Sequence, residues 1–464
     1  TVGGTLARPS ADLKAAFGSV SAGALVLTDA TMDLSFRRGA DASDGRISVV
    51  AGSNYGPARG SGNFYLGGDR IRLTDVDLDA GGVTATGDIA LSNRIPSSAD
   101  LTFTARPGAF LASGTADGRI RLTEGAGAET AILDVTGRNV RLAGSSWTIR
   151  SLDLEGRGTL DRLPFTLKAD VGGATPVSFD GTGVYSRQTN AQTIVLEGSG
   201  RVREIAFATR NPAVVALSGD GRVVRVDLGV GGGVLTGELR QDSRAAILEA
   251  NLTSVELGSL APDLRGRATG RLSLRGSGDD LSGSANITLQ DVRSIDAPQS
   301  LAIDGTVNAV LVDNTLRVQA QVADDGAVSA KADITLPVEA SAAPLRLAVV
   351  RTRPMSGEID IQGQVQPVWD LFLGGERSLS GQINARATLA GSIAAPRVNG
   401  RMDLWEGGFR DNATGLQLRD ITLASRFDDT TAMVESFSAT DGSGGRVSGD
   451  GRIGLREAPV PASS

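Results

Sequence analysis

Strict alternation of apolar and polar residues is the feature that most constrains the fold of this chain. Between residues 382 and 393, Ile383, Leu389 and Ile393 occupy one set of alternate positions, while Gln382 and Arg386 belong to the other. Because successive side chains of a strand point to opposite faces, this spacing predicts a strand with one apolar and one polar face. The same period recurs along the chain and helical spacing is rare, so the sequence predicts an all-β fold.

Glycine-rich turn signals separate the predicted strands about every eight to twelve residues. Two related phrases, at 71–91 and 437–455, run apolar strand, glycine-rich turn and a further strand. No proline-rich linker interrupts the pattern, which favours one continuous elongated sheet with many hairpins. At ~4.8 Å per strand, about forty strands would extend on the order of 190 Å.

Two stretches depart from the alternation, and they set the predicted divisions of the chain. Residues 252–266 and 367–381 carry bunched apolar residues before a glycine-rich exit, which predicts a short helix in each. We therefore expect an N-terminal part at 1–251, a middle repeat at 252–378 that opens with a short helix, and a repeat at 379–455. Residues 456–464 are predicted to be a disordered tail.

The composition excludes much of ordinary site chemistry. The 464 residues include no Cys and no His, which removes thiol nucleophiles, imidazole bases and Cys/His zinc sites. The net charge is −7 and the bases are scattered, whereas a nucleic-acid binder is expected to carry a clustered basic excess. No apolar run of membrane-spanning length and no signal peptide are visible. We expect no enzyme activity, no cofactor, no metal and no nucleic-acid partner.

One acidic segment resembles the start of a calcium loop. Asp75, Asp77 and Asp79 alternate, but Ala80 stands where an EF-hand needs glycine and Thr86 where it needs glutamate. Alternation places all three carboxylates on one strand face. We therefore predict a solvated face and no calcium site.

Other apparent motifs also have simpler explanations. Adjacent aspartates, which a glycosidase would use as acid and base, are more often turn residues; they are Asp279/Asp280, Asp324/Asp325 and Asp428/Asp429. The glycine-rich segment 229–237 predicts a hairpin turn, because it lacks the spacing of a phosphate-binding loop. Trp369 and Phe372 are predicted to pack in an apolar cluster.

The segment 379–455 resembles the TamB branch of the AsmA-like, bridge-like lipid transfer proteins of Gram-negative bacteria. The likeness is carried by Gly381, Gly391, Pro396 and Gly400, followed by a strand, an "L-x-L-R-D" connector at 416–420 and a glycine-rich hairpin. Residues 252–291 are similar, and weaker copies extend toward the N-terminus.

The resemblance implies a β-sheet folded into a half-pipe, the β-taco, with an apolar groove. It also implies a conduit for phospholipid between the inner and outer membranes, linked to outer-membrane protein assembly. Full-length members of the translocation and assembly module are tethered to the inner membrane, cross the periplasm and act with an Omp85-type, TamA-like outer-membrane partner. Without the anchor and a recognisable partner-binding region, this chain is expected to be an internal fragment.

Seventeen apolar residues are predicted to line the lipid groove because they share the alternating face. They are Ile120, Leu122, Leu272, Leu274, Ile287, Leu289, Ile303, Val307, Ile359, Ile361, Val365, Ile383, Leu389, Ile393, Val398, Met402 and Leu404. Soluble proteins seldom expose more than a few hundred Å² of continuous apolar surface, so either a second layer or an apolar ligand must cover this face.

Two other functions stay open at this point. A surface adhesin or autotransporter passenger would form a parallel β-helix with a filled core of the same aliphatic residues, though neither Asn ladders nor a strict short repeat is present. A polysaccharide-cleaving solenoid would use carboxylates and Arg. A filled core and an open groove produce the same alternation.

Overall fold

The chain divides into two compact units, Thr1–Leu217 and Ser218–Ser464, here called unit 1 and unit 2. The computed structural model describes residues 1–22, 24–92, 95–123, 130–143, 145, 147–159, 161–173, 175–188, 191–297, 301–324 and 327–454. The predicted tail at 456–464 lies outside the described residues. The predicted divisions at 251/252 and 378/379 both fall inside unit 2.

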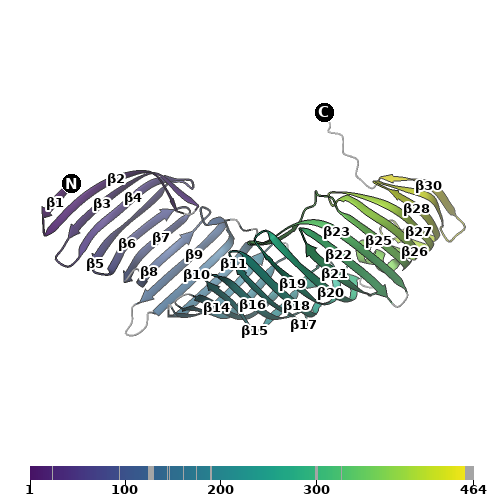
Figure 1. Ribbon diagram of the computed structural model, residues 1–464, viewed down its shortest axis with the longest axis horizontal. Coiled ribbons are helices and arrows are strands. Elements are labelled where there is room, and N and C mark those ends of the chain that lie inside the picture. Colours follow the sequence, from purple (N-terminus) through teal and green to yellow (C-terminus); the bar gives the residue numbers. More distant parts are fainter. Residues whose placement is uncertain are drawn as a thin grey trace, which may run out of the picture. The chain divides into compact units, whose positions relative to one another are not determined.

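Unit 1 is built from strands joined mostly by tight turns. Its strands lie side by side in chain order, coloured purple to blue (Figure 1). From β1 to β14 each strand pairs antiparallel with the next. The strands are β1 (Val2–Thr5), β2 (Arg8–Ala22), β3 (Leu25–Arg38), β4 (Ser43–Ser53), β5 (Ala58–Gly67), β6 (Arg70–Ala80), β7 (Val83–Ser92), β8 (Ile95–Ala105), β9 (Leu111–Thr123), β10 (Thr130–Leu142), β11 (Thr148–Thr159), β12 (Arg162–Gly172), β13 (Val177–Gln188), β14 (Ala191–Val202) and β15 (Ile205–Ser218).

Unit 2 repeats this plan with two short helical insertions. Its strands also pair antiparallel in sequence, except that β23 pairs with both β24 and β25. The elements are β16 (Gly221–Val230), β17 (Gly233–Asp242), β18 (Ala245–Glu256), η1 (Leu257–Ser259), β19 (Leu264–Ser277), β20 (Asp280–Ser294), β21 (Ile303–Val312), β22 (Thr315–Asp324), β23 (Val328–Ala342), β24 (Leu345–Val349), β25 (Ser356–Gln364), α1 (Gln366–Leu373), β26 (Arg377–Ser392), β27 (Ala395–Asp411), β28 (Gln417–Asp428), β29 (Thr431–Thr440) and β30 (Arg446–Gly454).

The prediction of an all-β fold is confirmed, but the estimate of about forty strands is too high. The described residues form 30 strands. Many of these strands have ten to seventeen residues, so a regular turn spacing of eight to twelve residues overestimates their number. Antiparallel pairing also means that the parallel β-helix alternative is wrong for the paired strands.

Paired glycines close two of the hairpins. Gly81 and Gly82, between β6 and β7, have φ of 61° and 85°, and Gly231 and Gly232, between β16 and β17, have φ of 53° and 74°. A two-residue hairpin turn of type I′ needs positive φ at both central positions, which glycine adopts without steric cost. The prediction of a hairpin turn within 229–237 is therefore confirmed.

Bulges interrupt several strands at polar residues with left-handed backbone. Asp75, with φ of 51°, lies at the register shift between Leu73 and Val76 in β6. Asp291 in β20 and Asp420 in β28 lie at similar shifts. Asp75 therefore does not simply alternate with Asp77 and Asp79 as predicted, because a bulge adds a residue and re-aims the side chain.

The helical predictions are only partly correct. Residues 252–256 complete strand β18, and only Leu257–Ser259 form a 3-10 turn. Helix α1 begins with Pro367 in its first turn, where a missing N–H costs little, but the predicted helical stretch 367–381 ends at Leu373. The predicted connector at 416–420 is largely strand, because β28 begins at Gln417. Within the described residues, no helix has the length and apolar character needed to cross a membrane.

Candidate functional site

A row of apolar residues crosses the sheet of unit 1, with each residue directly opposite the next from β2 to β14. No charged, hydroxyl or amide side chain interrupts it. At ~4.8 Å between strands, the row extends about 58 Å. This central row of unit 1 consists of Ala15, Met32, Val49, Gly60, Leu78, Ala85, Phe103, Gly118, Val135, Leu154, Leu167, Gly181 and Gly198.

The opposite face of the same strands is polar throughout the adjacent row. Each member again stands opposite the next, so the division between the two faces follows directly from strand pairing. This polar row consists of Lys14, Asp33, Ser48, Ser61, Asp77, Thr86, Thr102, Arg119, Asp134, Glu155, Thr166, Thr182 and Glu197. We call these two sides the apolar face and the polar face of unit 1.

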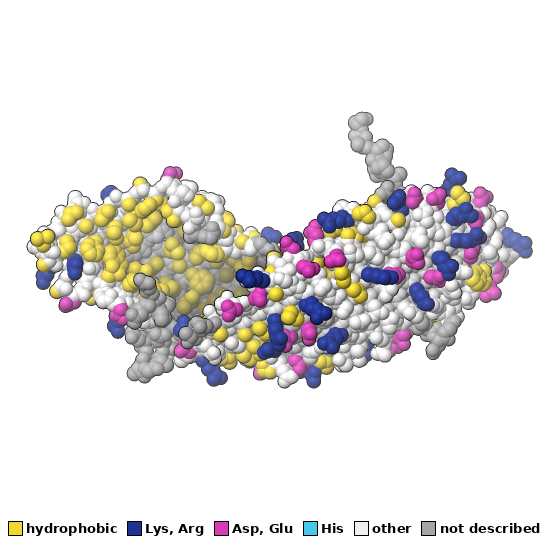
Figure 2. All heavy atoms as spheres, in the orientation of Figure 1, with side chains coloured by type: hydrophobic (Ala, Val, Ile, Leu, Met, Phe, Trp, Pro, Cys, Tyr) yellow, Lys and Arg dark blue, Asp and Glu magenta, His cyan; other side chains and the backbone are white. Residues whose placement is uncertain are grey.

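The middle of the apolar face of unit 1 is open. Figure 2 shows hydrophobic side chains gathered in a hollow over this unit. Leu13, Leu78 and Ile120 are 51%, 40% and 39% exposed, respectively. Other parts of this face are buried, for example the cluster of Ala99, Leu122 and Ala131. Such a continuous exposed apolar surface is typical of a binding surface.

Phenylalanines on this face lie over glycines of the neighbouring strand. Phe103 of β8 stands opposite Gly118 of β9, and Phe165 of β12 stands opposite Gly183 of β13. A Cβ built on either glycine would come within 2.4 Å of the Cζ of its phenylalanine. Because glycine has no side chain, each ring can pack against the backbone of the neighbouring strand. The ring then does not project into the hollow.

Unit 2 carries an equivalent apolar row. It crosses every strand from β16 to β30 except β24, and it contains no polar side chain. This central row of unit 2 consists of Leu228, Leu235, Leu252, Gly270, Ile287, Val307, Ala320, Ala332, Ile359, Ala387, Gly400, Phe427, Ala432 and Ile453.

Packed segments cover the margins of this second apolar face. The end of β23 reaches the turn before β20, where the Ala342 N–H donates to the Gly278 carbonyl oxygen at 2.9 Å. Val338 and Leu281, 0% and 2% exposed, are buried there in one cluster. On another part of the face, Val368 and Leu371 of α1 pack against a cluster around Leu257. The central row lies between these covered margins.

Sixteen of the seventeen predicted groove residues lie on the apolar faces of the two units. Val365 follows the end of β25 but packs against Ile383 and Leu404 on this face. Ile393 does not lie on it, because β26 ends at Ser392 and Ile393 occupies the turn before β27. Six of the sixteen are at most 9% exposed and contact neighbouring protein: Leu122, Leu274, Ile303, Val365, Ile383 and Leu404. Residues such as Val307, Ile359 and Leu389 are only partly buried, so they remain available to a ligand.

The groove residues predicted from the sequence omit much of the apolar face of unit 1. Only Ile120 and Leu122 were assigned to the groove there, although Leu101 and Phe103, and Phe165 and Leu167, alternate in the same way. The alternation was therefore a sufficient signal for the face. The covering of glycine by phenylalanine carries no local signal, because the partners belong to different strands.

Exposed ion pairs are frequent on the polar face of unit 1 and on the corresponding face of unit 2. Arg119 donates from Nε and Nη2 to the two carboxylate oxygens of Asp100, both at 3.0 Å, and holds the pKa of Asp100 below its usual value. Hydrogen bonds from Arg317 and Gln319 lower the pKa of Asp333 to about 2. These carboxylates stay ionised at neutral pH, so this face is favourably solvated.

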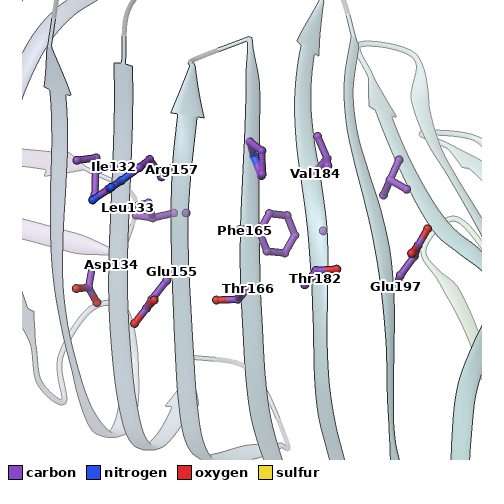
Figure 3. A pocket seen from close by; sticks show the side chains of 14 residues that line it. Ile132, Leu133, Asp134, Glu155, Arg157, Phe165, Thr166, Thr182, Val184 and Glu197 are labelled. Carbon is purple, nitrogen blue, oxygen red and sulfur yellow. The ribbon is translucent and has the colours of Figure 1, made fainter.

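A shallow cavity on the polar face of unit 1, about 710 Å³ in volume, collects carboxylates and hydroxyls. Asp134, Glu155 and Glu197 come from β10, β11 and β14, with Thr166 and Thr182 between them on β12 and β13 (Figure 3). Within the described residues no hydrogen bond joins these side chains into an acid and base pair, and no group of three acidic residues could hold a metal ion.

The prediction that the aspartate pairs are turn residues is only partly correct, because Asp280, Asp324 and Asp428 are the first or last residues of β20, β22 and β28. Asp279 lies in the turn between β19 and β20, and Asp429 has φ of 53° between β28 and β29. The pair Asp324/Asp325 falls partly outside the described residues. Trp369 donates from Nε1 to the Arg377 carbonyl oxygen at 3.1 Å, but Phe372 is 75% exposed, so the prediction that it packs in a cluster is wrong.

Comparisons with known proteins add no assignment: no protein-family model matches this sequence, and no curated protein matches it significantly.

Proposed function

We propose that this chain is a segment of a lipid conduit, in which phospholipid acyl chains lie along the apolar faces of the two units. The observation that carries the proposal is the central row of each unit, which crosses thirteen strands in unit 1 and fourteen in unit 2 without a polar side chain. An acyl chain placed along such a row meets no polar side chain.

The energetics favour this occupant. A sixteen-carbon acyl chain in water costs about 13 kcal/mol at ~0.8 kcal/mol per CH₂, and a lipid with two chains costs roughly twice that. An apolar surface that continues from strand to strand removes this barrier at each point along the path. Passage of a lipid along the row requires no nucleophile, base or metal. The row itself consists of apolar side chains and glycines.

The open hollow favours a conduit over a filled core. Leu78 and Ile120, near the middle of unit 1, are 40% and 39% exposed. In a sealed core side chains at this position would touch protein on all sides. An apolar ligand is the simplest cover for the part of this surface that remains open.

The sequence resemblance extends this proposal to a cellular setting. We propose that the chain belongs to the TamB branch of the AsmA-like proteins and acts in the periplasm, carrying phospholipid between the inner and outer membranes. In this proposal an Omp85-type outer-membrane protein is the partner of the full-length protein, which is tethered to the inner membrane. The glycine pattern of residues 379–455 supports this assignment.

Site-specific photocrosslinking combined with mass spectrometry tests the proposal. A photoreactive amino acid is placed at Leu78 or Ile120 on the apolar face, and at the adjacent Asp77 or Arg119 on the polar face as matched controls. In cells, phospholipid adducts are expected from the first pair only. Lipid extracted from the purified chain should contain phospholipid. Equal crosslinking from both faces, or no adduct from either, would contradict a lipid conduit.

A further inference from the structure

A second cavity lies on the polar face of unit 1, and arginines dominate its lining. It has a volume of about 770 Å³ and is formed by strands β3 to β8. Its main side chains are Arg37, Arg46, Asn63, Tyr65, Arg70 and Arg72. A cavity of this size falls within the range of small-molecule sites.

Strand register brings these arginines together. Arg46 of β4 stands opposite Asn63 of β5, and Arg72 of β6 stands opposite Tyr65 of β5. Arg37 and Arg46 therefore lie on one side of β5, while Arg70 and Arg72 lie on the other. Because β4 and β6 are two strand spacings apart, about 10 Å of sheet separates Arg46 from Arg72, and Arg37 on β3 lies one strand further away.

The bulge in β6 adjoins this cavity. Asp75, with φ of 51°, accepts a hydrogen bond from the Asn63 side-chain amide at 2.8 Å, and its own N–H donates to the Asp88 carboxylate at 2.9 Å. A bulge bends its strand and increases the local twist, and such features are common next to binding sites. Thr74, next to the bulge residue, lines the cavity.

The charge of the lining is opposite to that of the chain. Four arginines and one aspartate, Asp44, line the cavity, and the carboxylates of Asp75 and Asp88 lie beside it, so the cavity is locally basic although the whole chain carries −7. Arg37 and Asp44 are 3.8 Å apart and both mostly exposed, so this pair neutralises little. In the part of the chain that the structure describes, neither Arg46 nor Arg72 has a carboxylate within ion-pair distance. The cavity therefore attracts anions.

We propose that this cavity binds a ligand that carries at least two phosphate groups. The planar fork of arginine matches phosphate oxygens in a bidentate geometry, and two arginine pairs on either side of β5 provide a place for two such groups. The hydroxyls of Ser35, Thr74 and Ser98 supply neutral donors around them. The site lies on the face opposite the central row and does not depend on the proposed lipid conduit.

Calorimetric titration with inorganic pyrophosphate tests the site. The chain is compared with the double variants R46A/R72A and R46E/R72E. The matched control is Arg138→Glu, an exposed arginine of β10 on the same polar face but outside the cavity. The two double variants should bind pyrophosphate at least tenfold more weakly, whereas the control should stay within about twofold. Thermal melts monitored by circular dichroism check that every variant is folded.

Flotation with vesicles distinguishes a soluble ligand from a phosphorylated lipid headgroup. Vesicles of phosphatidylcholine alone are compared with vesicles that contain cardiolipin, which carries two phosphates. Pyrophosphate binding, or cardiolipin binding, that is lost in R46A/R72A supports the site and identifies the source of the phosphates. If the unmodified chain binds neither probe, or if R46A/R72A binds as tightly as the unmodified chain, the proposal is overturned.

Discussion

The ring of Phe103 covers Gly118 on the neighbouring strand. The two residues are paired across β8 and β9, and a Cβ on Gly118 would lie 2.4 Å from the Cζ of Phe103. The glycine thus allows a large apolar side chain to contribute surface without standing up into the hollow. Both residues belong to the central row of unit 1.

Replacing Gly118 by alanine should raise the Phe103 ring into the hollow. The new methyl group occupies the place of the ring edge, and overpacking of this kind typically costs about 1–3 kcal/mol. We expect a lower urea midpoint and less phospholipid recovered with the purified chain. The control is Gly60→Ala in the same row, where the added Cβ meets Leu78 Cδ1 at an ordinary 3.5 Å. Equal effects of the two variants would show that the ring does not matter.

A charge in the open part of unit 2 should block lipid passage without unfolding the protein. Leu389 pairs with Gly357 and Val398 on the apolar face and is only partly buried. Leu389→Asp places a carboxylate in the path of an acyl chain, while water can still reach it. We expect a severalfold loss of lipid crosslinking at Ile359 with a nearly unchanged melting temperature. The adjacent polar-face variant Thr388→Asp should crosslink normally.

The prediction of two faces from the sequence succeeds because the relevant period is local. The face on which a side chain lies depends only on its position within its own strand. The sequence therefore places Leu272, Ile287 and Ile359 correctly on the apolar face. Ile393 is misplaced because Ser392 ends the strand and the turn breaks the alternation.

How deeply a side chain is buried within a face depends on contacts with residues that are distant in the sequence. Leu272 and Leu274 alternate in one strand, yet Leu274 is only 9% exposed and belongs to the cluster with Val338, 64 residues further along the chain. The basic cavity has the same origin, since Arg37 and Arg72 are brought to one cavity only through the register of four strands, β3 to β6. A single sequence without coordinates does not reveal such pairings.

Truncating a residue at the covered margin should destabilise unit 2 much more than truncating one in the central row. Leu281 is 2% exposed beneath the end of β23, so Leu281→Ala should cost about 2–5 kcal/mol through lost contacts and a cavity. Ile359 is only partly buried, and Ile359→Ala should cost clearly less. Chemical denaturation followed by circular dichroism measures both. Similar losses would indicate that the central row is as tightly packed as the margin.

Asp333 should make unit 2 less stable in acid. Hydrogen bonds from Arg317 and Gln319 lower its pKa from an ordinary 3.8 to about 2. A carboxyl whose pKa is lower in the folded state stabilises the fold above pH 4, and this contribution disappears as the pH falls toward 2. Asp333→Asn should therefore have a lower urea midpoint than the unmodified chain at pH 7, and the two midpoints should converge near pH 2. A difference that does not change with pH would contradict this account.

Asp370 should make unit 2 less stable at neutral pH than in acid. It is 5% exposed on α1, and burial raises its pKa. Among the described residues, the only hydrogen bond to its carboxylate comes from the Gln366 side-chain amide at 3.4 Å. Because the folded state favours the protonated acid, ionisation at neutral pH works against folding, and this penalty vanishes below the ordinary pKa of 3.8. Asp370→Asn keeps the shape of the side chain without the charge, so it should raise the urea midpoint at pH 7 and leave it unchanged near pH 3. A lower midpoint at pH 7 would mean that the carboxylate has a stabilising partner.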